Sequence, residues 1–354
     1  MRNDQTALPN ISFCSSLNGD AWRDLDGPKA FESWHFDAIS DNGNEALVIA
    51  FYDNYALSPR FFESKQVLEK TKCPAVSFVY SVDGKVVLSS INEFAAKDFT
   101  ASPGKANCSL ASSSFCIEGA DYGSGFFVTV DILGRGGSRI HAELEWLFIE
   151  SDLMQPTGEQ HAAVWNLVVP RADVSGRIML TGRRGETKKQ IKFRGTGYHD
   201  HISSENVHYR NLASRMWGRA HFVDSTIVFE RHGGVQNASA AGKLFLIRDG
   251  MIQAYGANCD VSGHKRDGWG LRVPLDIVYT SQDGIRVSIK PVSKIRSGFS
   301  EVKMLSSISL DLADGRTRNA TGITEFVDPR RMKNRLSRWI ARFRIGRNGR
   351  PPIF

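Results

Sequence analysis

The chain has 354 residues, of which 41% are hydrophobic and 23% are charged, as in an ordinary globular protein. Its formal net charge is +7, but residues 330–350 hold nine Lys or Arg and no Asp or Glu, so +7 minus 9 leaves −2 for the rest of the chain. The near-neutral body argues against a nucleic-acid-binding protein. A transmembrane helix is excluded because no run of about 18 apolar residues occurs.

The cysteines and the first residues of the chain bear on its compartment. The odd count and irregular spacing of the cysteines suggest neither a disulfide framework nor a zinc site. The opening residues, MRNDQTALPNISFCSSLNGD, lack the apolar stretch of a secretory signal. We therefore expect a reducing, cytoplasmic location. The five cysteines are Cys14, Cys73, Cys108, Cys116 and Cys259.

Taken in chain order, most of the sequence predicts β-hairpins. Runs rich in β-branched and aromatic residues flank short turns, most of them Asp-Gly, where glycine adopts a positive φ without strain. Strands alternate with turns rather than with helices, so parallel βαβ units are not expected. The fold class is therefore predicted to be all-β. The five hairpins span residues 75–91, 126–150, 243–256, 275–292 and 307–323.

The polar stretch SDLMQPTGEQ, residues 151–160, divides this β-rich region into two halves of similar size. Each half is long enough for one barrel or sandwich. We predict four parts: an N-terminal segment at 1–29, a first β domain at 30–155, a second at 156–327, and a basic helix and tail at 328–354.

The end of the chain predicts an amphipathic helix. Asp328 and Pro329 have the pattern of an N-cap followed by proline at the first helical position. The apolar stripe is expected to dock on the second barrel; contact with an anionic membrane is the less favoured alternative. The stripe consists of Met332, Leu336, Trp339, Ile340 and Phe343.

The stretch RGTGYHDHISSEN, residues 194–206, concentrates proton-handling side chains. On a strand, His199 and His201 share one face, and Tyr198 and Asp200 share the other. The histidines could bind a metal with Glu205 or His208, but nothing in the sequence fixes further ligands beside them, so no metal is expected. Alternatively, these side chains cap a strand end through backbone hydrogen bonds.

A third interpretation of this stretch is an acid–base or hydrogen-bonding site inside a β cavity. In an apolar pocket beside Tyr198, the pKa of Asp200 would be raised, so the carboxyl could stay protonated. Downstream, SRMWGRAHF places Trp217, Arg219 and His221 on one face of a strand. We therefore expect Asp200 and Arg219 to line one cavity.

Tryptophans recur beside charged groups elsewhere in the chain. FESWHFDAIS, residues 31–40, puts Trp34 on one face of a strand and Asp37 on the other, and Trp165 begins a further strand. Such a pattern suits a cavity for a long apolar ligand with a few polar anchors. It also suits an ordinary barrel core with a snorkelling arginine.

Four segments together resemble one family: SWHFDAISDNGNEALVIAFYDN, WNLVVPRADVSGRIML, GTGYHDH and WGRAHF. Their order is similar to that in the carotenoid 1,2-hydratase (hydroxyneurosporene synthase)-like proteins, a superfamily that includes AttH-like proteins and fungal lipocalin-like Diels–Alderases of the cytochalasan type. The resemblance covers most of residues 30–327. It implies two lipocalin-like β-barrels in tandem with a ligand cavity inside or between them.

One departure from the family bears on the reaction. In the hydratases of this family the motif continues as Tyr-x-Asp-x-Asn-Trp-Gly. Tyr198 and Asp200 match, but Ile202, Ser203 and Ser204 stand where Asn-Trp-Gly would be. The groups that would place water near a protonated alkene are therefore changed, whereas the implied fold is not affected.

The resemblance implies two enzyme functions, and a third reading is a non-catalytic carrier of apolar ligands. The favoured one is a cofactor-independent cyclase that folds an apolar linear polyene for an intramolecular [4+2] cycloaddition in polyketide–peptide biosynthesis. The other is a hydratase in which Asp200 protonates an isoprenoid double bond. The catalytic candidates are Asp200, Tyr198, Arg219 and His221. The substrate-binding candidates are Trp34, Asp37, Trp165, His199, His201 and Trp217.

Overall fold

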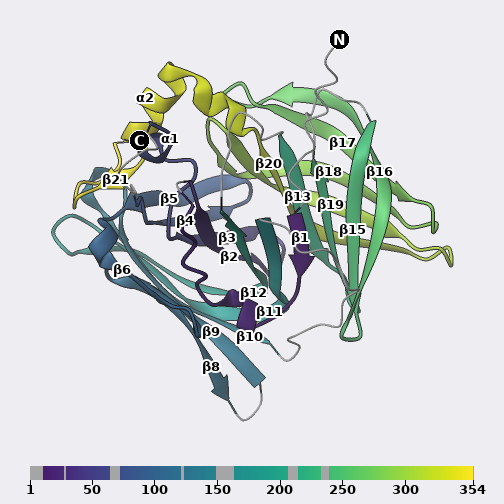
Figure 1. Cartoon of the computed structure of the whole chain (residues 1–354), viewed down its shortest axis with the longest axis horizontal. Helices are drawn as coiled ribbons and strands as arrows, with labels where there is room; N and C mark the ends of the chain where they lie inside the picture. Colours follow the sequence, from purple (N-terminus) through teal and green to yellow (C-terminus); the bar gives the residue numbers. More distant parts are fainter. Residues whose placement is uncertain are drawn as a thin grey trace.

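The computed structural model of the protein describes residues 11–27, 29–63, 72–120, 123–148, 163–205, 214–232 and 239–353. Strands make up most of this part of the chain (Figure 1). They form one large curled sheet and one closed barrel, which confirms the prediction of an all-β chain with tandem barrel-like halves. The predicted boundary stretch 151–160 lies outside the described residues.

The first sheet is a curled half-barrel of thirteen strands. Two of them join it by parallel pairing: β1 (Ile11–Cys14) with β11, and β21 (Gly346–Arg347) with β5. The others follow one another across the sheet in the order β5 (Lys85–Glu93), β4 (Ala75–Val82), β3 (Glu45–Tyr52), β2 (Phe31–Ser40), β12 (Thr187–Ser204), β11 (Ala163–Thr181), β10 (Arg139–Phe148), β9 (Gly123–Leu133), β8 (Ser113–Ala120), β7 (Lys105–Leu110) and β6 (Phe99–Ser102).

The second sheet is a closed antiparallel barrel in which β13 pairs with β20. Its turn at Asp249 and Gly250 has positive φ at both residues, as the hairpin prediction requires. The barrel strands are β13 (Arg215–His221), β14 (Thr226–His232), β15 (Ser239–Arg248), β16 (Met251–Arg266), β17 (Arg272–Ser281), β18 (Arg286–Ser297), β19 (Glu301–Asp311) and β20 (Thr317–Val327).

The strand pairing corrects the predicted limits of the two halves. Residues 156–327 were expected to form the second barrel, but β11 and β12 belong to the first sheet, where β11 pairs with β10 and β12 pairs with β2. The closed barrel therefore begins at Arg215. The partner of a strand cannot be predicted from its local residue pattern, because pairing depends on contacts between distant segments.

The centre of the first sheet is buried on both faces. The inner, concave side holds an aromatic core that includes Phe36, Phe126 and Trp146. The outer side packs against the outside of the closed barrel through a shared cluster that includes Trp165 and Trp217. Strands β2, β11 and β12 therefore lie between two hydrophobic layers.

Helical elements are few and short in the described part of the chain. They are α1 (Pro59–Glu63), α2 (Arg335–Phe343) and the 3-10 turns η1 (Asn18–Asp20), η2 (Ala96–Asp98), η3 (Arg135–Gly137) and η4 (Pro329–Lys333). Among the described residues, no helix is long and apolar enough to cross a membrane.

The C-terminal segment differs from its prediction in two respects. Asp328 does cap the first turn, but the turn ends at Lys333 and α2 begins after a second cap at Asn334. The segment also reaches the first sheet rather than the second barrel alone: α2 lies beside α1 (Figure 1), and Arg338 and Arg342 both pair with Glu63.

Candidate functional site

The GTGYHDH motif lies in the middle of β12, between β11 and β2. Its glycines are needed for close packing. A Cβ at Gly195 would lie 2.1 Å from the carbonyl oxygen of Ile39, and one at Gly197 would lie 2.5 Å from Nε1 of Trp146. Because real Cβ atoms do not approach so closely, only glycine lets β2 and the indole pack against this strand.

The predicted alternation of side chains along β12 is confirmed. His199 and His201 face the inner core, where His199 stacks on Phe36 with ring centroids 3.8 Å apart. Tyr198 and Asp200 face the closed barrel, where Tyr198 lies 6.2 Å from Trp217. The two histidines of the motif therefore pack in the inner core, and the tyrosine and the aspartate pack against the barrel.

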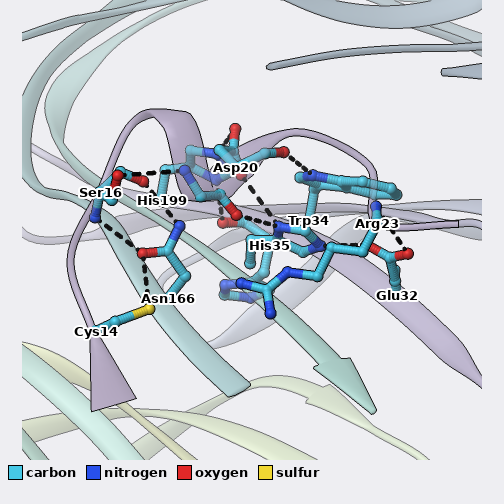
Figure 2. A network of polar contacts seen from close by, with 11 residues as sticks. Cys14, Ser16, Asp20, Arg23, Glu32, Trp34, His35, Asn166 and His199 are labelled. Atoms are coloured by element: carbon cyan, nitrogen blue, oxygen red, sulfur yellow. Dashed lines mark hydrogen bonds and ion pairs between the residues drawn. The ribbon is translucent and has the colours of Figure 1, made fainter. Parts of the chain in front are cut away.

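On the inner face, both histidine rings contact polar groups of the protein, and Figure 2 shows those of His199. His199 Nδ1 lies 3.0 Å from the carbonyl oxygen of His35, and its Nε2 lies 3.1 Å from Asp20. His201 Nε2 lies 3.0 Å from Glu32. Both nitrogens of the His199 ring therefore have a partner, one on the backbone of β2 and one on the N-terminal segment.

The histidines help to anchor the N-terminal segment over the core. Figure 2 shows this segment crossing the inner side of β12 and β11. Asn166 donates to the carbonyl oxygen of Ser16 at 2.8 Å, and the Trp34 indole donates to the carbonyl oxygen of Asp20 at 2.9 Å. The strand-cap alternative placed Asp200 and the histidines at a strand end with backbone hydrogen bonds. The histidines do contact the carbonyl oxygens of His35 and Gly19, but from within β12.

No metal-binding group forms here within the described residues. No cluster of three or more His, Cys, Asp or Glu side chains in those ranges has the geometry to hold an ion. Of the two further ligands considered from the sequence, Glu205 is exposed to solvent and His208 lies outside the described residues.

On the outer face, Asp200 is fully buried and bonded through one oxygen only. Its Oδ2 accepts hydrogen bonds from the Trp165 indole at 2.9 Å and from the Tyr198 hydroxyl at 3.0 Å. Its Oδ1 has no partner among the described residues. Burial raises the pKa of Asp200 to about 6, although the Trp165 and Tyr198 hydrogen bonds oppose the rise. The predicted elevation of this pKa is confirmed, so the carboxyl can carry a proton near neutral pH.

Arg219 and Asp37 form a buried ion pair next to Tyr198. Arg219 donates to Oδ1 of Asp37 through Nε at 2.8 Å and through Nη2. Its guanidinium lies 5.6 Å from the centre of the Tyr198 ring. Burial raises the pKa of Asp37, and the guanidinium opposes that rise. Arg219 Nη1 and Asp37 Oδ2 remain without partners in the part of the chain that the structure describes.

Lys303 and His35 complete the cluster, and neither was among the site residues chosen from the sequence. Lys303 donates to Nε2 of His35 at 3.2 Å and pairs with Glu325. Burial, then Lys303 and Arg219, hold the pKa of His35 well below its usual value, so the ring is neutral. An ammonium can only donate, so Nε2 accepts and Nδ1 carries the proton. Lys303 follows His35 by 268 residues, and no local pattern links them.

The remaining candidates divide between the two faces. Trp217 joins the outer cluster, with its ring 5.5 Å from His35 and 5.8 Å from Trp165. His221 lies at its end and contacts Thr226 at 2.9 Å; burial, then Arg219 and Arg171, lower its pKa. Trp34 is on the inner face and stacks on His201 at 4.6 Å.

Asp200 and Arg219, which were expected to line one cavity, both lie in the packed interface between the first sheet and the barrel. Both side chains have no exposed surface, because the outer face of the first sheet packs directly on the barrel wall. The structure brings together a closed polar cluster in which four buried atoms have no hydrogen-bond partner among the described residues: Arg219 Nη1, Asp200 Oδ1, Asp37 Oδ2 and His35 Nδ1. The last two lie 3.8 Å from each other.

Comparison with known proteins gives relatives along most of the chain. No protein-family model matches it. A hydroxyneurosporene dehydrogenase from Chlorobaculum tepidum is 22% identical over 93% of this chain and 91% of its own length. A crystal structure of CghA with Sch210972 covers 90% of this chain and 97% of its own, at 12% identity and a TM-score of 0.54. A second CghA structure has a TM-score of 0.53.

These findings confirm the resemblance to the carotenoid hydratase-like superfamily that the sequence segments indicated. The CghA structures share the tandem arrangement of barrel-like sheets. At 12% and 13% identity these structures show that the fold is shared. The reaction depends on the side chains of the site in this chain.

Proposed function

We propose that this protein is a cofactor-independent cyclase that catalyses an intramolecular [4+2] cycloaddition of a linear polyene in polyketide–peptide biosynthesis. The observation that carries the proposal is the set of buried, partnerless polar atoms around Arg219 and Asp200. A buried donor or acceptor without a partner costs about 1–3 kcal/mol, so a cluster of them is a candidate for receiving polar groups of a ligand.

Arg219 would act as the hydrogen-bond donor of the reaction. Its Nε and Nη2 are fixed by Asp37, which leaves Nη1 free to bind a carbonyl conjugated with the dienophile. Such a donor lowers the barrier by stabilising the charge that builds on the carbonyl oxygen. Three π bonds become two carbon–carbon σ bonds and one new π bond, and no proton enters or leaves.

The cluster is closed in this structure, so a substrate could enter only if the first sheet and the barrel wall move apart. The aromatic side chains of the cluster would then hold the substrate in shape. Trp217 packs against Trp165 and Tyr198, with ring centroids 5.8 Å and 6.2 Å away, and the last two both bond to Asp200. Folding a flexible polyene so that its reacting ends meet removes an entropic part of the barrier. Trp34, His199 and His201 were candidates for this role, but they lie on the inner face with the N-terminal segment, so the proposal leaves them out.

Hydration is the second candidate, and a specific observation favours it. Asp200 has a pKa near 6 and a partnerless Oδ1, so in its protonated form it could give that proton to an isoprenoid double bond. Water would then add to the cation and return a proton. The relative named hydroxyneurosporene dehydrogenase, which matches almost the whole chain, agrees with an isoprenoid substrate.

An incubation in isotopically labelled water distinguishes cyclisation from hydration. The enzyme is incubated in ¹⁸O-labelled water with neurosporene and, separately, with a linear polyene bearing a terminal 1,3-dicarbonyl. A cyclase gives an isomer of the substrate in which no oxygen from water has become bonded to a carbon of the chain. A hydratase gives a product that is heavier than the substrate by one molecule of labelled water. A carrier binds either probe and converts neither, which would overturn both enzyme proposals.

Variants assign the residues. For the cyclase, Arg219→Lys, which keeps the charge but loses the two-pronged donor, should lower kcat at least tenfold, whereas Asp200→Asn should change it little. The rate should also be flat between pH 5 and 8. For the hydratase the order reverses, and the rate falls as the pH rises through about 6 because the protonated acid is lost.

A further inference from the structure

A cavity of about 390 Å³ lies away from the cluster described above, between the first sheet, the barrel and the C-terminal segment. Strand β5 and the β9–β10 turn form one side, the β18–β19 turn forms another, and residues of η4 and α2 also line it. None of Asp37, Asp200 and Arg219 lines it. Much of its wall is apolar, including Val87, Leu88, Ile140, Leu180, Met332 and Ile345.

One part of the wall carries an excess of positive charge. Arg296 pairs with Glu301 at 3.2 Å, and its side chain is only 12% exposed. Arg344, from the C-terminal segment, donates to the carbonyl oxygen of Ser297 at 3.0 Å. Arg135 also lines the cavity, so its wall holds three guanidinium groups and one carboxylate, that of Glu301. Burial and the nearby Arg296 lower the pKa of Arg344, as expected for two cations brought together.

The same region offers further donors. Nε of Arg296 is buried and has no partner in the described ranges. Tyr55 also lines the cavity, and burial, together with the charge of Glu301, raises the pKa of its hydroxyl well above the usual value, so the hydroxyl stays protonated. Donors and net positive charge at one part of an apolar cavity match the shape of an acid with a hydrocarbon tail.

We propose that this cavity binds an amphipathic organic anion, with its carboxylate or equivalent group at Arg296 and Arg344 and its apolar chain along Val87, Leu88 and Ile140. Because Met332, Arg344 and Ile345 belong to the C-terminal segment, the ligand also ties this segment to the body of the protein. This site is separate from the Arg219 cluster, so it does not depend on the reaction proposed there.

The test compares three probes that share a twelve-carbon chain. Dodecanoate, dodecanol and dodecyltrimethylammonium are titrated calorimetrically into the full chain, below the micellar concentration of each. Dodecanoate is expected to bind with one site, dodecanol at least tenfold more weakly, and the cation not at all. Equal binding of dodecanoate and dodecanol, or no binding of dodecanoate, would overturn the proposal.

Variants locate the site. Arg344→Gln should weaken dodecanoate about tenfold and leave dodecanol unchanged, while Val87→Phe, which fills the apolar part, should weaken both. Arg342→Gln is the matched control, because this arginine of the same segment pairs with Glu63 outside the cavity. Full binding by Arg344→Gln would contradict the assignment. Asp200→Asn should bind normally; loss of binding in that variant would place the ligand in the Arg219 cluster instead.

Discussion

Arg219 and Asp37 are held in a place where neither charge meets water, and this sets the cost of changing them. Removing one member of such a pair leaves the other charge buried and uncompensated, whereas replacing both with apolar groups costs much less. The sequence suggested an arginine that lines a cavity together with Asp200. Its complete burial changes that expectation.

Arg219→Leu should therefore lower the free energy of unfolding by about 3–5 kcal/mol, because it strands the Asp37 carboxylate. The double variant with Asp37→Leu should recover most of that loss. Chemical denaturation followed by circular dichroism measures both. As a control, Arg316→Leu removes an exposed pair with Asp314 and should leave stability unchanged. A double variant no more stable than Arg219→Leu alone would argue against an isolated pair.

Asp200 should make stability depend on pH in a defined direction. Its pKa is about 6 in the folded state and 3.8 in the unfolded chain, so the folded state favours the protonated form. That contribution is complete below pH 3.8 and is lost as the pH rises through about 6. Asp200→Asn mimics the protonated acid. It should match the wild type at pH 4 and be more stable by about 2–3 kcal/mol at pH 7.5. A difference that does not change with pH would refute this.

At the scale of elements, the C-terminal segment is built into the fold rather than appended to it. Met332 is buried, and Gly346–Arg347 adds a parallel strand to β5. The apolar stripe predicted from the sequence is only partly used, because Leu336 and Trp339 remain 62% and 56% exposed. Docking is therefore carried by the two ends of the segment more than by the middle of α2.

Deletion of residues 330–354 should lower the melting temperature by more than about 3 °C, because it removes this burial and pairing. Trp339→Ser, at an exposed position of the same segment, should leave the melting temperature unchanged. Differential scanning calorimetry provides the comparison. The membrane alternative would instead be supported if the deletion left the melting temperature intact but abolished salt-sensitive sedimentation with anionic liposomes.

At the scale of the whole molecule, the two sheets share a core. Trp165 and Tyr198 of the first sheet pack with Trp217, Val228 and Phe245 of the barrel in one buried cluster. A second shared cluster joins the two sheets farther along their interface. Neither sheet can leave the other without exposing these side chains to water.

Thermal unfolding should accordingly occur in one cooperative transition, with the near-ultraviolet signal of the tryptophans and the far-ultraviolet signal of the strands changing together. Calorimetric and van't Hoff enthalpies should agree. Two resolved transitions, or a barrel that melts while the first sheet persists, would show that the shared core is too weak to couple them.

Several features of this protein were determined by sequence alone, because they depend on neighbouring residues. The Asp-Gly turns fix hairpins through backbone conformation, and the twofold period of a strand separates His199 and His201 from Tyr198 and Asp200. Tertiary structure decided the rest. It placed β11 and β12 in the first sheet, brought Lys303 to His35, and closed Asp200 and Arg219 into a cluster without exposed surface. These outcomes depend on which distant strands pair and pack. The local residue pattern of a strand does not determine which strand it pairs with.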